Sequence, residues 1–120
     1  MPKTVMIVED YADVRMMMKI LIRSHGYTVI EAADGFEAVE KSVQYHPDLI
    51  LMDLAMPIMD GATATKLIRK IEGCENTSIV ALTAYSNTSF NKAIEAGFDD
   101  VIIKPLHFEK LEPLLNHYLA

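Results

Sequence analysis

The fold is decided by Leu49-Ile50-Leu51-Met52-Asp53-Leu54-Ala55-Met56-Pro57, a stretch in which four apolar residues lead into a single carboxylate. A short apolar run of this kind predicts a strand that is buried on both faces, as in a parallel sheet. Asp53 then lies at the carboxyl end of a central strand, where open α/β sheets bind their ligands. A buried carboxylate there needs a cation or hydrogen bonds, but an aspartate that caps a strand-to-loop turn would give the same pattern. Taken alone, Asp53 leaves both interpretations open.

Short apolar runs and amphipathic segments alternate along the rest of the chain. Besides residues 49–53, the expected strands are residues 4–8, 28–32, 78–83 and 101–103. The expected helices are residues 12–24, 36–45, 61–72, 86–96 and 108–118. Helical spacing puts Val14, Met17, Val43, Leu67 and Ile94 among the inward-facing residues. This alternation predicts a parallel sheet with helices on both faces, and residues 1–120 are expected to form one domain.

Composition and charge exclude several classes of protein. Hydrophobic residues make up 51% of the 120 residues, which is enough for a core. The formal net charge of -6 argues against a nucleic-acid partner, because phosphate backbones are bound by basic patches. Cys74 is the one cysteine, so an internal disulfide is excluded. The apolar run of residues 5–8 is too short for a signal peptide or a membrane span, so we expect a cytoplasmic protein without membrane attachment.

Charged and hydroxyl side chains stand at the ends of four expected strands. They are Glu9 and Asp10 after the first strand, Asp53 in the third, Thr83 in the fourth and Lys104 after the fifth. The carboxyl ends of a doubly wound sheet lie along one edge, so these groups should converge. Three acids raise one another's pKa unless a cation compensates their charge. Mg²⁺ fits best, because it binds oxygen ligands and needs only one or two carboxylates, and Mn²⁺ could replace it.

The remaining groups suit a phosphoryl ligand. The ammonium of Lys104 can pair with one phosphoryl oxygen, and the hydroxyl of Thr83 can donate to another. Ala55 and Ala84 are small, so their backbone N–H groups can be approached. Each residue alone also has an ordinary structural explanation, as a turn acid, a helix cap or a strand exit. Their combination favours a functional site.

One ordered set of motifs runs from the first strand to the last: Glu9-Asp10, Asp53 with Met56-Pro57 and Asp60-Gly61, Thr83-Ala84, Ala96-Gly97 and Lys104-Pro105. With this set the sequence resembles the response regulator receiver domain, the CheY-like domain of two-component signalling, over the whole chain. The resemblance implies a flavodoxin-like (βα)5 fold. Its doubly wound, five-stranded parallel sheet would have the strand order 2-1-3-4-5.

By this resemblance Asp53 is the phosphoacceptor, which takes a phosphoryl group from a phosphohistidine of a sensor histidine kinase or a histidine phosphotransfer protein. Asp10 and Asp53, with Glu9 through a water and the backbone carbonyl of Ala55, would hold Mg²⁺. Phosphorylation would switch the binding of a downstream protein. The domain would be a monomer or would dimerise on phosphorylation. Whether it stands alone or belongs to a larger regulator or hybrid kinase is left open.

The resemblance also assigns roles near the phosphoryl group. Lys104 and Thr83, with Ala84 and Ala55, would bind it, and Thr83 would swing toward it to report the modification. A cis peptide bond is expected before Pro105.

One position departs from the family pattern. The fifth strand usually carries an aromatic residue three positions before the lysine, where this chain has Val101. Val101 has no ring that could move inward as Thr83 turns toward the phosphoryl group. We therefore expect the signal to pass through the Thr83-Ala84-Tyr85 loop and the fourth helix, whose low helix propensity would make reordering cheap.

Two rival interpretations are kept. A haloacid-dehalogenase-type phosphatase would be a true enzyme that also uses an aspartyl phosphate and Mg²⁺, but it wants a second aspartate at the position of Ala55. A flavin-binding flavodoxin-like domain would need a Ser/Thr/Gly-rich phosphate loop after the first strand, where this chain has the acidic Glu9-Asp10-Tyr11. The favoured interpretation is a binding module that catalyses only its own phosphorylation and dephosphorylation, and that turns over no external substrate.

Overall fold

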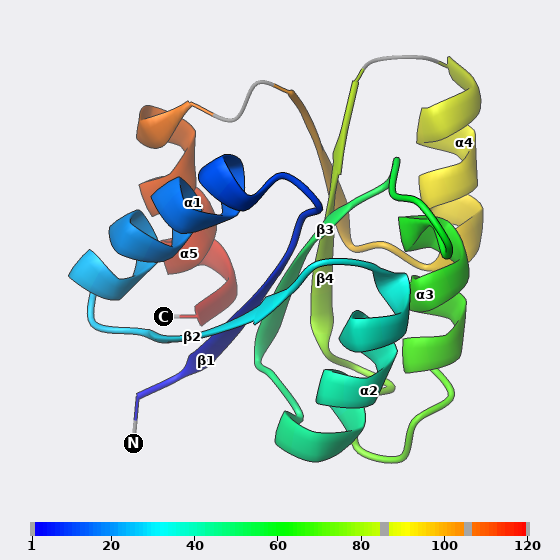
Figure 1. Ribbon diagram of the computed structural model, residues 1–120, viewed down its shortest axis with the longest axis horizontal. Coiled ribbons are helices and arrows are strands. Elements are labelled where there is room, and N and C mark those ends of the chain that lie inside the picture. Colours follow the sequence, from blue (N-terminus) through cyan, green and yellow to red (C-terminus); the bar gives the residue numbers. More distant parts are fainter. Residues whose placement is uncertain (1, 85–86, 105–106, 120) are drawn as a thin grey trace.

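A five-stranded parallel sheet forms the centre of the computed structural model, which describes residues 2–84, 87–104 and 107–119 (Figure 1). Its strands are β1 (Thr4–Val8), β2 (Thr28–Ala32), β3 (Leu49–Asp53), β4 (Ser78–Thr83) and β5 (Asp100–Ile103). They lie in the order β2-β1-β3-β4-β5, and every neighbouring pair is parallel. The predicted α/β class and strand order are therefore confirmed.

Helices cover both faces of this sheet (Figure 1). They are α1 (Ala12–Ser24), α2 (Gly35–Tyr45), α3 (Gly61–Ile68), α4 (Asn87–Ala96) and α5 (Phe108–Leu119). α1 and α5 pack on one face, and α2, α3 and α4 lie on the other. Among the described residues, no helix is long and apolar enough to cross a bilayer.

α3 is shorter than the sequence pattern predicted. The helix ends at Ile68, and the backbone then tightens into turns, with Lys70 N–H donating to the carbonyl of Leu67 and Ile71 N–H to that of Ile68. Bonds of this shorter spacing are common where a helix ends. The apolar periodicity continues to Ile71 because this residue still packs against the core. Periodicity alone therefore overestimated the length of the helix.

The two central strands explain the near-continuous apolar runs of the sequence. Every residue of β3 is buried, and alternate residues pack on opposite faces of the sheet. Leu51 faces the cluster under α1 and α5, whereas Ile50 faces the cluster under α2 and α3. A strand covered on both faces has no solvent side that would call for polar residues.

Among the described residues, five that were predicted to face inward are exposed, namely Val14, Met17, Val43, Leu67 and Ile94. Val43 follows the buried Ser42, and one step of about 100° along a helix turns a side chain away from the sheet. Val14 lies on the stripe of the buried Met18, but it lines an open cavity between α1 and α5. At these positions the apolar stripe of the helix is wider than the stripe that is buried.

Candidate functional site

The strand register brings the predicted site residues to one edge of the sheet. Val8 of β1 lies opposite Met52 of β3, so that Glu9 and Asp53, which follow them, become neighbours. Asp53 in turn lies opposite Leu82 of β4, and Thr83 lies opposite Ile103 of β5. Residues that are far apart in sequence therefore meet because parallel strands place their carboxyl ends side by side.

Asp53 is buried, with 2% of its surface exposed, and both of its carboxylate oxygens are hydrogen-bonded. The backbone N–H of Ala55 donates to Oδ1 at 3.0 Å, and the ammonium of Lys104 donates to Oδ2 at 2.8 Å. One donor lies two residues from Asp53 and the other 51 residues away, and the second carries a full positive charge. Together they compensate for the desolvation of the carboxylate.

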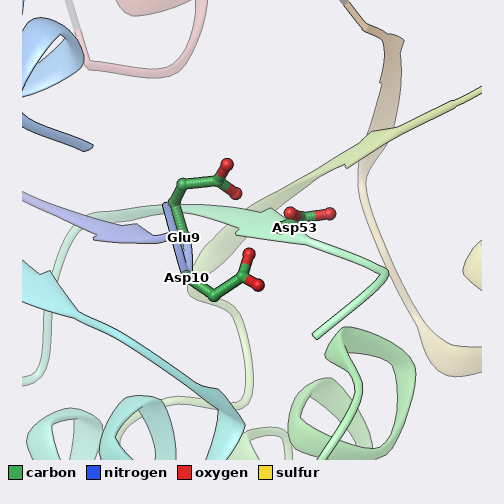
Figure 2. A group of neighbouring side chains, drawn as sticks. All are labelled: Glu9, Asp10 and Asp53. Atoms are coloured by element: carbon green, nitrogen blue, oxygen red, sulfur yellow. The ribbon is translucent and has the colours of Figure 1, made fainter. Parts of the chain in front are cut away.

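Two further acids complete the cluster (Figure 2). Glu9, Asp10 and Asp53 each offer a carboxylate oxygen, and these oxygens lie within 4.8 Å of one another. Oε2 of Glu9 and Oδ1 of Asp10 are buried and find no hydrogen-bond partner among the described residues. Buried carboxylate oxygens without donors are what a hard divalent cation would satisfy, so the residues present fit Mg²⁺.

The electrostatics of the cluster show the same shortage of positive charge. Burial, and then the hydrogen bond and negative charge of Asp53, raise the pKa of Glu9 to about 8, against the attraction of Lys104. Burial alone would lower the pKa of Lys104, but its hydrogen bond to Asp53 and the charges of Asp53 and Glu9 raise it overall. One ammonium therefore does not balance three acids, and the ionised form of Glu9 is disfavoured when no cation is bound.

Lys104 links the edge strand β5 to the centre of the sheet. Its backbone N–H donates to the carbonyl of Thr83 at 2.8 Å, which fixes the start of the side chain. Its ammonium lies 2.8 Å from Asp53 and 3.6 Å from Oε2 of Glu9. The lysine therefore lies next to Asp53, for which the family resemblance implies the role of phosphoacceptor.

The other predicted residues lie nearby with different partners. Thr83 is buried, and its hydroxyl donates to the carbonyl of Ala84 at 2.8 Å. Ala55 and Ala84 are exposed, and the N–H of Ala55 is engaged with Asp53. Val101 is half-buried in β5.

Two predicted positions, Tyr85 and Pro105, lie outside the described residues.

A cavity of about 390 Å³ lies between α1 and α5 and borders the acid cluster. Its lining is mostly apolar, with Met17, Leu82 and Leu111 among the residues, but Glu9 and Lys104 also line it. A group that entered this cavity would lie beside both charged residues.

Arg15 is a neighbour of the site that the sequence analysis did not identify. Its guanidinium donates to the backbone carbonyl of Glu9 at 2.6 Å. The available signal was the first basic residue of the helix, four positions after Tyr11 and close in sequence to Glu9 and Asp10. Sequence does not show this contact, because it depends on the direction in which the chain leaves β1.

The fold and the site together define a class: doubly wound α/β proteins of the CheY-like, flavodoxin-like type with an acidic cluster at the carboxyl edge of the sheet. The family model described as "Response regulator receiver domain" matches residues 5–116. The chain therefore belongs to the response regulator receiver domain family and is a receiver domain of two-component signalling.

Two relatives of similar length support this assignment. The chain is 42% identical to the chemotaxis protein CheY of Thermotoga maritima over 118 residues, which cover 97% of each protein. It is 38% identical to the chemotaxis protein CheY of Bacillus subtilis over 121 residues, which cover 99% of each.

Solved structures agree with these relatives. The receiver domain of the sensor histidine kinase PA1611 from Pseudomonas aeruginosa matches with a TM-score of 0.91 and 32% identity over 98% of each chain, and its structure has a magnesium ion coordinated in the active site cleft. The receiver domain of Ssk1 from Saccharomyces cerevisiae, solved in complex with the histidine phosphotransfer protein Ypd1, matches with a TM-score of 0.89 and 30% identity over 98% of this chain and 88% of that one.

Proposed function

We propose that Asp53 accepts a phosphoryl group from a phosphohistidine of a sensor histidine kinase or a histidine phosphotransfer protein. The observation that carries the proposal is the buried Asp53 carboxylate, which is bound by Lys104 within a cluster of three acids. A carboxylate oxygen of Asp53 attacks phosphorus, so that an O–P bond forms and the N–P bond to the donor imidazole breaks. The electron pair of that bond stays on the imidazole nitrogen.

Groups of the chain itself stabilise the transferred phosphoryl group in this proposal. Lys104 already contacts Asp53, so its ammonium can pair with a phosphoryl oxygen after a short movement. The hydroxyl of Thr83 exchanges the carbonyl of Ala84 for a second phosphoryl oxygen. The N–H groups of Ala55 and Ala84 are on exposed residues and can donate to the phosphoryl group. The exchange made by Thr83 reports phosphorylation to a downstream protein.

The acid cluster holds a divalent cation in the same proposal. Asp10 and Asp53, the backbone carbonyl of Ala55, and Glu9 through a water would bind Mg²⁺, which Mn²⁺ can replace. When bound, the ion supplies positive charge to the carboxylates and to the incoming phosphoryl group. The buried oxygens of Glu9 and Asp10 that find no donor among the described residues support this site, as does the magnesium ion in the PA1611 receiver domain.

The domain catalyses only its own phosphorylation and dephosphorylation in this proposal. Ala55 occupies the position at which a phosphatase of the haloacid dehalogenase type would carry its second aspartate. The complex of the Ssk1 receiver domain with Ypd1 supports a phosphotransfer partner for this chain as well. The single domain over residues 1–120, the cytoplasmic location and the monomeric or phosphorylation-dependent dimeric state stay predictions.

Acetyl phosphate with Mg²⁺ tests the proposal directly. Intact mass spectrometry should show one added phosphoryl group on the wild type and none on Asp53→Asn. Asp13→Asn is the matched control, because Asp13 lies close by in the first turn of α1 and is exposed, and it should be phosphorylated like the wild type. Phosphorylation of a folded Asp53→Asn variant to the wild-type extent would refute the assignment of Asp53.

A further inference from the structure

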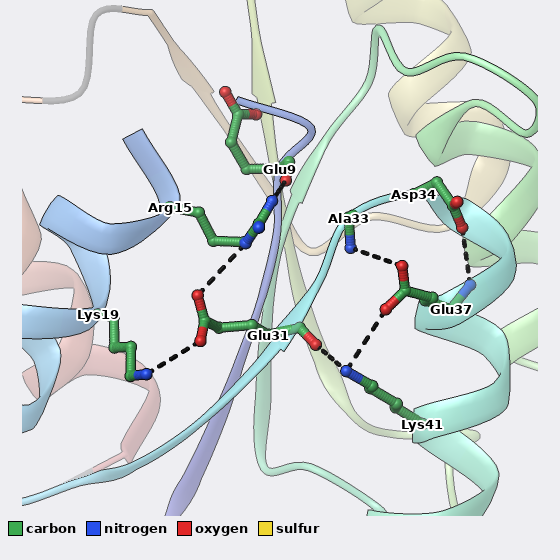
Figure 3. Close-up of polar contacts among 8 residues, drawn as sticks. All are labelled: Glu9, Arg15, Lys19, Glu31, Ala33, Asp34, Glu37 and Lys41. Carbon is green, nitrogen blue, oxygen red and sulfur yellow. Dashed lines mark hydrogen bonds and ion pairs between the residues drawn. The ribbon is translucent and has the colours of Figure 1, made fainter. Parts of the chain in front are cut away.

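Arg15 reaches from α1 back to the turn that carries the acids (Figure 3). Its Nη1 donates to the backbone carbonyl of Glu9 at 2.6 Å, and its Nε donates to a carboxylate oxygen of Glu31 on β2 at 3.3 Å. Only 19% of the Arg15 side chain is exposed. The planar guanidinium can hold two partners at once. Arg15 therefore joins α1, β2 and the β1–α1 turn.

Glu31 is itself fixed by two lysines (Figure 3). Lys19 donates to its second carboxylate oxygen at 3.0 Å, and Lys41 of α2 donates to its backbone carbonyl. The hydrogen bond and charge of Lys19, and then those of Arg15, lower the pKa of Glu31 despite its partial burial. Glu31 is thus an ionised partner that stays in place and orients the guanidinium of Arg15.

The contact of Arg15 acts on the peptide group between Glu9 and Asp10. A peptide group is planar, so a fixed carbonyl of Glu9 also fixes the N–H of Asp10. On the other side, the N–H of Glu9 donates to the carbonyl of Ala32 at 3.1 Å. Tyr11, the N-cap residue of α1, makes no capping hydrogen bond with its side chain. The hydrogen bond from Arg15 to the carbonyl of Glu9 therefore fixes the backbone of this turn, which the side chain of Tyr11 does not cap.

We propose that Arg15 is a positioning residue for the divalent-cation site. By fixing the peptide between Glu9 and Asp10, it holds the side chains of both acids toward Asp53 without touching the cation. The inference rests on the proposed function, in which these acids bind Mg²⁺. Groups that orient metal ligands from outside typically change affinity by roughly tenfold or more when they are lost.

Electrostatics alone makes the opposite prediction, which gives the inference a sharp test. Arg15 is a positive charge close to the cluster, so its removal by Arg15→Met should strengthen Mg²⁺ binding if only Coulomb forces matter. A positioning role predicts weaker binding, because the acids lose their common orientation. Arg23→Met is the matched control, since it removes the same charge from an exposed residue in the last turn of α1.

The experiment measures two quantities on each variant by NMR. The first is the chemical shift of the Asp10 amide in metal-free protein. This amide belongs to the same peptide group as the carbonyl of Glu9. The second is the dissociation constant of Mg²⁺ from a titration. For Arg15→Met we expect a shifted Asp10 amide and a dissociation constant roughly tenfold higher than that of the wild type. Arg15→Lys offers one ammonium nitrogen in place of the several N–H donors of a guanidinium. Its Asp10 shift and its dissociation constant should lie between those of the wild type and of Arg15→Met.

A dissociation constant for Arg15→Met at or below that of Arg23→Met would overturn the inference, even if the variant melts earlier, because the role would then be structural only. If Arg15→Met does not fold, Arg15→Lys and Glu31→Gln are judged by the same two measurements. If the wild type binds no Mg²⁺, the proposed function fails. The positioning of the turn is then judged by the metal-free Asp10 shift, and an unchanged shift overturns it.

Discussion

The site receives residues from two kinds of strand that differ in burial. The central strands are β1 and β3, and the edge strand is β5. Every residue of β3 is buried and all but the first of β1, whereas β5 begins and ends with exposed residues. Glu9 directly follows β1 and Asp53 is the last residue of β3, whereas Lys104 directly follows the edge strand β5. The acids are thus placed by strands that are costly to disturb, while their counter-charge comes from a strand with freedom to adjust.

This difference separates two tasks of the site. A phosphoacceptor needs acids at fixed distances, and close packing on both faces of a strand resists displacement. A residue that first pairs with a carboxylate and then with a phosphoryl group has to move, and sparse burial makes movement less costly. If the central strands fix the acids and the edge strand adjusts, mutations in the two regions should have different effects.

Truncating a side chain in β3 should lower the stability of the protein more than truncating one in β5. Leu51→Ala, in the fully buried β3, should lower the free energy of unfolding by about 3 to 4 kcal/mol, because it removes a packed side chain and leaves a cavity. Ile103→Ala, in β5, should lower it by less than about 1 kcal/mol, since Ile103 is 46% exposed. Urea denaturation measures both. Equal losses would show that the edge strand is held as firmly as the centre.

Removal of the edge charge should impair phosphorylation. Lys104→Met leaves the carboxylate of Asp53 without its ammonium, and we expect the rate of phosphorylation by acetyl phosphate to fall by roughly a hundredfold. Lys110→Met, which removes a charge from an exposed residue of α5, is the control and should keep the wild-type rate. A Lys104→Met variant that is phosphorylated as fast as this control would exclude Lys104 from the reaction.

The buried acid of the centre should make stability depend on pH. In metal-free protein the pKa of Glu9 is raised to about 8 from its ordinary value of 4.5, so the folded state holds a proton that the unfolded state has lost. This contribution to stability is fully present below about pH 4.5 and is lost as the pH rises through about 8. Glu9→Gln cannot ionise, so its stability relative to the wild type should rise by roughly 3 kcal/mol between about pH 5 and pH 8.

Urea midpoints of both proteins in EDTA at about pH 5 and pH 8 provide the measurement. Glu40→Gln, at an exposed position of α2, is the control and should show no such divergence. If the urea midpoints of Glu9→Gln and the wild type differ by the same amount at both pH values, the pKa of Glu9 is not raised in the folded protein.

The smallest expected effect concerns the switch. Beryllofluoride with Mg²⁺ should shift the amide resonances of residues 84–96 in the wild type. Val101→Ala should change those shifts by less than roughly a factor of two, because Val101 is a half-buried aliphatic residue with no ring to reposition. Unchanged resonances of residues 84–96 in the wild type would refute a signal route through this segment.

Much of the fold was predictable from the sequence, and the misses have local causes. Unbroken apolar runs and short connections predicted the parallel strands, and the described strands match within one residue. The helix after Asp60 was predicted too long, because Ile71 packs inward from a turn. The exposed residues that were predicted to face inward are Val14, Met17, Val43, Leu67 and Ile94. They were missed because hydrophobicity shows which residues can be buried but not how far the sheet extends beneath a helix.

Periodicity and side-chain chemistry are local properties, so the sequence was enough to predict the order of strands and helices and the acids at the strand ends. The donors that meet those acids follow from the packing of the folded chain. The 2.8 Å contact of Lys104 with Asp53 depends on the register of β3, β4 and β5, and the contact of Arg15 with Glu9 depends on how α1 leaves β1. Such contacts join residues through packing rather than through spacing, so no pattern along the chain specifies them.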